Sequence, residues 1–304
     1  MSAPAAVSDQ ATPTLELREF AVRSFGTAWA APISLRTNAS RVGLVGDWEP
    51  FFQLLLGRAQ GSGGSASVLG HDLESAIARG VLGFAACDPR LPASFTVSEY
   101  LRHAARLSHG SPSRAVHDAQ RALDRFGLAE LAKRKLAELA LYQRRALGIA
   151  LATLTAPPVV CLEAPLRGLD APSADYVARL CLEAASYGRV LVSAALPRAP
   201  SPERSLLDAC DELFVQKQGL LVAHGAPNDV FAARARYALT VKGEQISAFA
   251  QTLREAGVRL EPRARPGSFT VELPAEGGAS TDRLLDAALE HGLIVLELEP
   301  LFSD

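Results

Sequence analysis

The sequence contains little lysine and no excess of positive charge. Four of its 31 basic residues are lysines, none of them before Lys133, and the formal net charge of the 304 residues is −2. A protein that binds nucleic acid normally presents a basic stripe, so this composition argues against a nucleic-acid partner. A glycine-rich phosphate loop that ends in lysine is also excluded from residues 1–132.

Long apolar runs and metal-spaced cysteines are missing as well. The uncharged stretch 146–162 is interrupted by Gly148, Pro157 and Pro158. It does not predict a membrane-spanning helix, which needs about 20 continuous apolar residues. The four cysteines show no metal-ligand spacing and lie in or beside apolar runs, which predicts buried, reduced thiols. Residues 1–13 have no basic start and no apolar core, so we expect a disordered tail rather than a signal peptide.

The sequence is, however, apolar enough to build a large core. With 48% hydrophobic residues over 304 positions, about two domains are expected.

The stretch 138–172 carries the clearest pattern in the sequence. Its first half, 143–155, is rich in small and apolar residues and predicts a buried helix. Val159–Leu162 then predicts a fully covered parallel strand, which ends at the carboxylate of Glu163 and is followed by Gly168-Leu169-Asp170.

Strand and helix patterns flank this stretch on both sides. Residues 15–22 alternate apolar and polar side chains, and 41–46, RVGLVG, predict a buried strand. The glycine-rich segment 61–67 is interpreted as a surface turn, and residues 92–139 predict charged helices. From residue 239 onward the pattern predicts the order βαββαβ, which is typical of a small ferredoxin-like module.

This order of elements resembles that of the ATP-binding cassette (ABC) ATPases. The buried helix, the strand ending in Glu163 and the Gly168-Leu169-Asp170 turn resemble that family's signature helix, Walker B strand and D-loop. Ordered fragments extend the resemblance over residues 14–304: LVG, LGHDL, LGF, TVSEYL, RFGLAEL, GLDAP and VAHGAP. It implies a three-layer α/β, P-loop NTPase-like nucleotide-binding domain at 14–238, with a helical subdomain at about 92–139. The α+β module at 239–304 resembles the C-terminal extension of cassette subunits in exporters.

The phosphate-binding loop of the family is degenerate at the matching residues. Instead of G-x-x-x-x-G-K-[S/T], the chain reads Gly46-Asp47-Trp48-Glu49-Pro50, with no lysine and no further glycine before Gly57. We interpret Trp48, Phe51 and Phe52 as apolar side chains that fill the vacated space. Phe25 falls where family members stack an aromatic ring on adenine; the alternative is that it packs on the edge of the sheet.

Other chemical groups of the family are replaced too. Cys87 stands at the position of the Q-loop glutamine, which contacts Mg²⁺ and the attacking water, and a thiol is a poor ligand for that hard cation. Glu163 replaces the metal-binding aspartate and keeps a carboxylate. Ala164 replaces the catalytic glutamate, and losing such a base typically costs roughly 10² to 10⁴ in rate. Ala195 replaces the switch histidine.

The signature motif, Leu-Ser-Gly-Gly-Gln, holds the γ-phosphate of the opposite subunit's ATP in the family. Here Ala140, Leu141 and Tyr142 replace its Ser-Gly-Gly part, and Gln143 survives. Asp170 keeps the position of the D-loop aspartate. The site that two subunits complete together is therefore expected to be damaged as well.

We therefore interpret the chain as a pseudo-ATPase, a non-hydrolysing structural or regulatory partner of a bacterial membrane permease, peripheral on the cytoplasmic face of the cell membrane. An active cassette subunit or a second copy of the chain would complete the complex. No cofactor is expected beyond weak Mg-ATP binding, for which Glu163 is the candidate metal ligand.

Two alternatives stay open. One is an atypical ATPase that uses Glu163 and Asp170 with a partner's residues. The other is a soluble scaffold or sensor whose C-terminal module binds a protein or small ligand.

Overall fold

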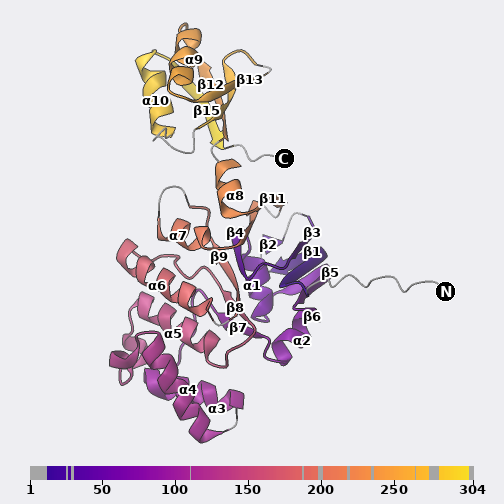
Figure 1. Ribbon diagram of the computed structural model, residues 1–304, viewed down its shortest axis with the longest axis vertical. Helices are drawn as coiled ribbons and strands as arrows, with labels where there is room; N and C mark the ends of the chain where they lie inside the picture. Colours follow the sequence, from indigo (N-terminus) through magenta and orange to yellow (C-terminus); the bar gives the residue numbers. More distant parts are fainter. Residues whose placement is uncertain are drawn as a thin grey trace, which may run out of the picture. The chain divides into compact units, whose positions relative to one another are not determined.

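The chain divides into two compact units, Met1–His224 and Gly225–Asp304 (Figure 1). The computed structural model describes residues 12–24, 27–28, 31–109, 111–186, 188–197, 201–217, 220–233, 236–263, 265–273 and 281–300. Phe25 and most of the expected N-terminal tail lie outside these described residues. The second unit begins earlier than residue 239, because that residue lies inside a strand of the second unit's own sheet.

The first unit opens with an antiparallel sheet of five strands, built around its longest member, β1. The strands are β1 (Leu15–Ser24), β2 (Thr27–Ala28), β3 (Ile33–Thr37), β5 (Gln60–Val68) and β6 (His71–Asp72). Buried and exposed residues alternate along β3, as expected for a strand with one face on the core and one in water. This sheet supplies one layer of the unit.

The glycine-rich segment is a strand, and the prediction of a surface turn there was wrong. β5 pairs antiparallel with β1, so that Val68 lies opposite Leu15. Glycine is depleted in strands because it offers no side chain to pack. Here the ring of Phe20 supplies that packing: a β-carbon built on Gly61 would lie 3.4 Å from it. The long ladder with β1 therefore outweighs the weak strand propensity of the glycines.

A six-stranded sheet forms the second layer, in the order β11-β10-β4-β9-β8-β7. Its strands are β4 (Arg41–Gly46), β7 (Leu82–Ala85), β8 (Val159–Leu162), β9 (Arg189–Ala194), β10 (Glu212–Lys217) and β11 (Leu220–Gly225). The ladders that join β10, β4, β9, β8 and β7 are parallel. All four residues of β8 are buried, which confirms the predicted covered strand before Glu163.

Helices complete the first unit (Figure 1). They are α1 (Glu49–Leu55), α2 (Leu73–Ala78), α3 (Val97–His109), α4 (Pro112–Arg125), α5 (Leu141–Thr153), α6 (Ala171–Ala184) and α7 (Pro202–Asp208). The buried side chains of α1 join the core between the two sheets, whereas α5 packs on β7 and on α6. The hairpin of α3 and α4 lies in the segment predicted to be a helical subdomain. Among the described residues, no helix combines the length and the apolar character that crossing a membrane requires.

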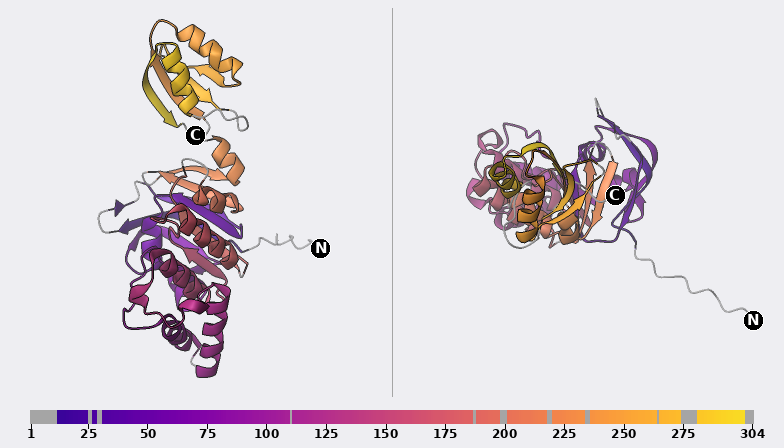
Figure 2. Two further views of the ribbon diagram at one scale, coloured as in Figure 1. Left: turned by 90° about the vertical axis from the view of Figure 1, so that its left-hand side faces the viewer. Right: turned by 90° about the horizontal axis from the view of Figure 1, so that it is seen from above.

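The second unit has the predicted βαββαβ order after a short helix, α8 (Pro227–Ala233). Its elements are β12 (Arg236–Lys242), α9 (Ile246–Glu255), β13 (Arg259–Pro262), β14 (Ser268–Glu272), α10 (Thr281–Glu290) and β15 (Ile294–Pro300). The strands pair antiparallel in the order β13-β14-β12-β15. Helices α9 and α10 lie side by side on one face of this sheet (Figure 2). This topology is ferredoxin-like.

The four cysteines lie in the interior, as the apolar residues around them in the sequence predict. All four are buried and free of disulfides, which confirms the prediction of buried thiols. Burial raises the pKa of Cys161 to about 12, because the ionised sulfur would lose its hydration. Such a thiol is neutral and unreactive at physiological pH.

Candidate functional site

The carboxyl ends of the parallel strands bring four of the predicted site positions to one edge of the central sheet. Gly46 ends β4, Cys87 follows β7, Glu163 follows β8 and Ala195 follows β9. In open α/β sheets this edge is where ligands bind. The topology therefore gathers these residues although they are spread over about half of the sequence.

Glu163 lies at the centre of this edge, and both of its carboxylate oxygens accept hydrogen bonds from the protein. Its residue is 4% exposed. Oε1 accepts from the side-chain amide Nε2 of Gln53 at 3.0 Å, and Oε2 accepts from the backbone N–H of Cys87 at 3.0 Å. Burying a carboxylate without hydrogen-bond partners is costly, so these two donors stabilise Glu163 in the interior. The sequence interpretation missed Gln53, whose signal is a polar residue within the apolar helix α1.

Arg167 forms a second set of contacts beside Glu163. Its Nε donates to the sulfur of Cys87 at 3.2 Å, and its Nη1 lies 3.7 Å from the carboxylate of Glu49. The hydrogen bond to Cys87 raises the pKa of the Arg167 guanidinium, so the group stays charged. We call Glu49, Gln53, Cys87, Glu163 and Arg167 the Glu163 cluster.

The turn between β4 and α1 is too short and too crowded to wrap around a ligand. Gly46 has φ +96°, and a β-carbon there would lie 1.9 Å from the carbonyl oxygen of Gln216, so only glycine fits. The N–H of Asp47 donates to Gln216 O at 3.4 Å, and the N–H of Trp48 donates to Gly46 O at 2.9 Å. Helix α1 then begins at Glu49. The amides of this turn therefore point into the chain's own structure.

Three aromatic side chains fill the space behind this turn. Trp48, Phe51 and Phe52 are 0% exposed, and consecutive rings meet edge to face with centroids 6.2 and 6.0 Å apart. The indole Nε1 of Trp48 donates to Phe214 O at 3.1 Å, so its polar atom is satisfied as well. These contacts support our interpretation that apolar side chains replace a phosphate loop.

The donors at this edge do not fit a magnesium-bound triphosphate. Phosphate binding at a helix N-terminus relies on backbone amides that are free to point at the ligand. Here the amides of Asp47 and Trp48 are engaged within the turn, and Glu49 places a carboxylate in the first turn of α1. A metal ion at Glu163 would have to displace the amides of Gln53 and Cys87.

The remaining predicted site residues serve local structure instead of joining the cluster. Gln143 caps its own helix, because its Oε1 accepts from the N–H of Ala140 at 3.0 Å. Asp170 likewise caps α6 by accepting from the N–H of Ser173 at 2.9 Å, and its hydrogen bonds with Ser173 lower its pKa. Ala195 offers no polar side-chain atom. These residues therefore add no donor to the cluster.

Arg145, on α5, was also missed by the sequence interpretation. It is 6% exposed, and its Nη2 donates to Arg167 O at 3.2 Å. Its Nε and Nη1 have no hydrogen-bond partner among the described residues. A buried guanidinium with unsatisfied donors is a cost to the fold.

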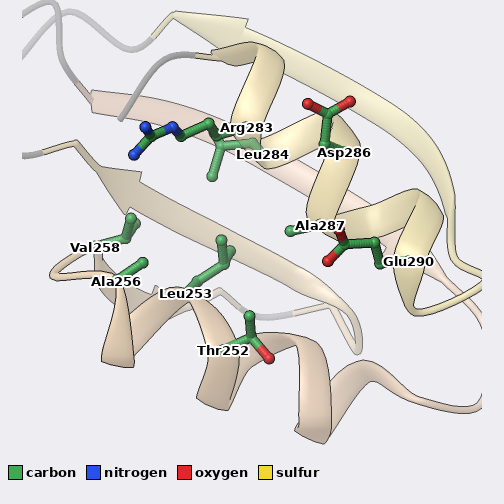
Figure 3. A pocket seen from close by; sticks show the side chains of 9 residues that line it. All are labelled: Thr252, Leu253, Ala256, Val258, Arg283, Leu284, Asp286, Ala287 and Glu290. Carbon is green, nitrogen blue, oxygen red and sulfur yellow. The ribbon is translucent and has the colours of Figure 1, made fainter. Parts of the chain in front are cut away.

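A groove of about 290 Å³ lies in the second unit, between α9 and α10 (Figure 3). Leu253, Val258 and Leu284 supply apolar lining, and Arg283 and Glu290 of α10 contribute charged groups. All of its lining residues belong to the second unit. The groove is therefore separate from the Glu163 cluster.

Comparisons with known proteins identify the fold. No protein-family model matches the chain. An ABC-type transporter of Penicillium crustosum is 26% identical over 183 residues, which cover 57% of this chain and 24% of that protein. A methionine import ATP-binding protein of Pseudomonas syringae pv. syringae is 26% identical over 212 residues, covering 66% of this chain and 62% of that protein. The chain thus spans about a quarter and about three fifths of the lengths of these two relatives.

Solved structures agree with these relatives. An ATP-binding subunit of an ABC transporter superimposes with a TM-score of 0.60 at 17% identity, covering 92% of this chain and 99% of that one. CbiO1 of Clostridium perfringens, part of an ABC transporter complex, has a TM-score of 0.61 at 20% identity and covers 81% of this chain and 98% of its own. The predicted α/β fold is confirmed, because the chain has the fold of an ABC nucleotide-binding domain.

Proposed function

We propose that this chain is a non-hydrolysing subunit of an ABC-type membrane transport complex, in which it acts as a structural or regulatory partner of a permease. One observation carries the proposal: both oxygens of Glu163, the carboxylate at the metal-binding position, accept hydrogen bonds from Gln53 and Cys87. A fold has no activity without its site. The retained ABC fold thus serves assembly rather than chemistry.

The loss of several chemical groups at once supports a pseudo-ATPase over a slow ATPase. Ala164 provides no base to polarise water, and Ala195 provides no donor to a γ-phosphate. The turn after β4 lacks the lysine that would neutralise phosphate charge. Each missing group typically costs orders of magnitude in rate, so their joint absence leaves no measurable turnover.

The partners follow from the same resemblance. CbiO1 is part of the ABC transporter complex CbiONQ, and the Pseudomonas relative is a methionine import ATP-binding protein. By analogy, we propose that this chain binds the cytoplasmic side of a bacterial permease, next to an active cassette subunit or a second copy of itself. Its role would be to hold the permease and any active subunit in a fixed arrangement.

The composition of the native complex tests this proposal. The chain, tagged at one end and expressed at its native level, should be extracted with membranes by mild detergent and co-purify with a permease in a fixed ratio. A matched sample carries Leu107→Ala and Val116→Ala, which remove two exposed apolar side chains of the α3–α4 hairpin. It controls for nonspecific adhesion of the folded chain to membranes through these side chains. Recovery of the unsubstituted chain as a stable, partner-free monomer in the aqueous extract would contradict the proposal.

A further inference from the structure

We propose that Gln53 and the backbone amide of Cys87 are built-in hydrogen-bond donors to Glu163, which lock α1 and the loop after β7 in one arrangement that nucleotide does not control. This inference rests on the proposed function and concerns how the same site is regulated. In the lock, uncharged amide donors of the protein occupy both oxygens of the carboxylate, where a metal ion would otherwise bind. The subunit is then held permanently in this one arrangement of α1 and the loop after β7.

The lock joins three segments that are distant in the sequence. Gln53 belongs to α1, Cys87 follows β7, and Glu163 follows β8, which pairs with β7. The two hydrogen bonds span 110 and 76 residues. Glu163 is also held through its own N–H, which donates to Ala85 O at 2.9 Å. Because donors from both sides converge on one carboxylate, α1 and the loop after β7 cannot separate without leaving a buried charge unsatisfied.

The hydrogen bonds to Glu163 hold the lock, and the neighbouring ion pair contributes little. Arg167 and Glu49 lie 3.7 Å apart with side chains 57% and 61% exposed, so water screens their attraction. The Cys87–Glu163 bond, in contrast, is buried, and the Gln53–Glu163 bond is partly buried. Hydrogen bonds to an ionised group away from water are about twice as strong as neutral ones.

Replacing Gln53 with leucine tests the lock, because leucine keeps a similar volume and removes the amide donor. The unfolding equilibrium constant of the first unit should rise roughly tenfold to a hundredfold, since one oxygen of a buried carboxylate loses its donor. Urea unfolding can be followed by tryptophan fluorescence, because both tryptophans belong to the first unit. If Gln53→Leu unfolds like the wild type, the lock is refuted.

Gln120 offers a matched control on the same unit. Its Nε2 donates to Asp124 Oδ1 at 2.9 Å, one helical turn away on an exposed surface. Gln120→Leu removes the same type of donor from the same type of acceptor. The change should be less than about threefold, because exposed pairs of this spacing contribute little. An equal effect of both substitutions would show that burial at Glu163 has no special role.

Two further measurements separate the lock from the proposed function. Adding Mg-ATP to the wild type should leave the unfolding midpoint unchanged, because ligands that bind the native state stabilise it. An upward shift would refute the lock, whereas the proposed function is overturned only by phosphate release or by the absence of a permease partner. If Gln53→Leu does not fold, hydrogen exchange of the wild type decides. The Cys87 amide should exchange at least about 100-fold more slowly than in an unfolded chain. Exchange at the unfolded rate would refute the lock and leave the proposed function standing.

Discussion

Replacing Trp48 with alanine should lower the free energy of unfolding of the first unit by about 3–5 kcal/mol, the range for a buried tryptophan. The indole is fully buried between the two sheets, in contact with Phe51, and its Nε1 donates to Phe214 O. Alanine would leave a cavity and an unsatisfied carbonyl. Urea unfolding followed by circular dichroism measures the loss without relying on the removed fluorophore.

Two control substitutions make this result interpretable. Trp48→Phe keeps an aromatic ring and loses the indole donor, so it should cost about 1–3 kcal/mol. Leu107→Ala, at a residue that is 76% exposed, should change stability by less than about 0.5 kcal/mol. If Trp48→Ala were as mild as Leu107→Ala, the indole would not fill the space behind the β4–α1 turn, and our account of that turn would fail.

Replacing Arg145 with methionine should stabilise the first unit, by about 1–4 kcal/mol. The arginine is buried on α5, and two of its nitrogens have no hydrogen-bond partner among the described residues. Methionine would occupy the space of the arginine side chain with an unbranched apolar chain, and it has no hydrogen-bond donors to satisfy. The measurement is again urea unfolding, at several salt concentrations.

The neighbouring Arg144 provides the matched comparison. Its Nε donates to Leu139 O at 2.9 Å, so Arg144→Met removes a satisfied bond and should cost about 0.5–1.5 kcal/mol. The two adjacent substitutions are thus expected to have opposite signs. Destabilisation by Arg145→Met would contradict the view that the unsatisfied donors of Arg145 are a cost to the fold.

Local patterns of apolar and polar residues predicted individual strands and the order of the elements in the second unit. The apolar run of β8, bounded by two prolines before it and a carboxylate after it, identified a covered parallel strand and placed Glu163 at its end. The resemblance to ABC ATPases implied the three-layer α/β domain, in which Gly46, Cys87 and Glu163 lie at the carboxyl ends of parallel strands. The βαββαβ order of the second unit followed from local patterns of apolar and polar residues.

The features that sequence reasoning missed depend on long-range contacts. Gln53 lies 110 residues from Glu163, and nothing in its local sequence indicates that its amide reaches that carboxylate. The strand β5 depends on its ladder with β1 and on Phe20, which local propensity ignores. The ladders of β12 with β14 and β15 likewise join strands that are far apart in the sequence.

Equilibrium binding of Mg-ATP to the purified full-length chain, measured together with phosphate release, tests the central claim most directly. Our account predicts no saturable binding up to about 1 mM nucleotide, a weak-affinity limit, and no phosphate release above a protein-free blank. Saturable binding at micromolar concentrations, with phosphate release that Glu163→Ala abolishes, would contradict it.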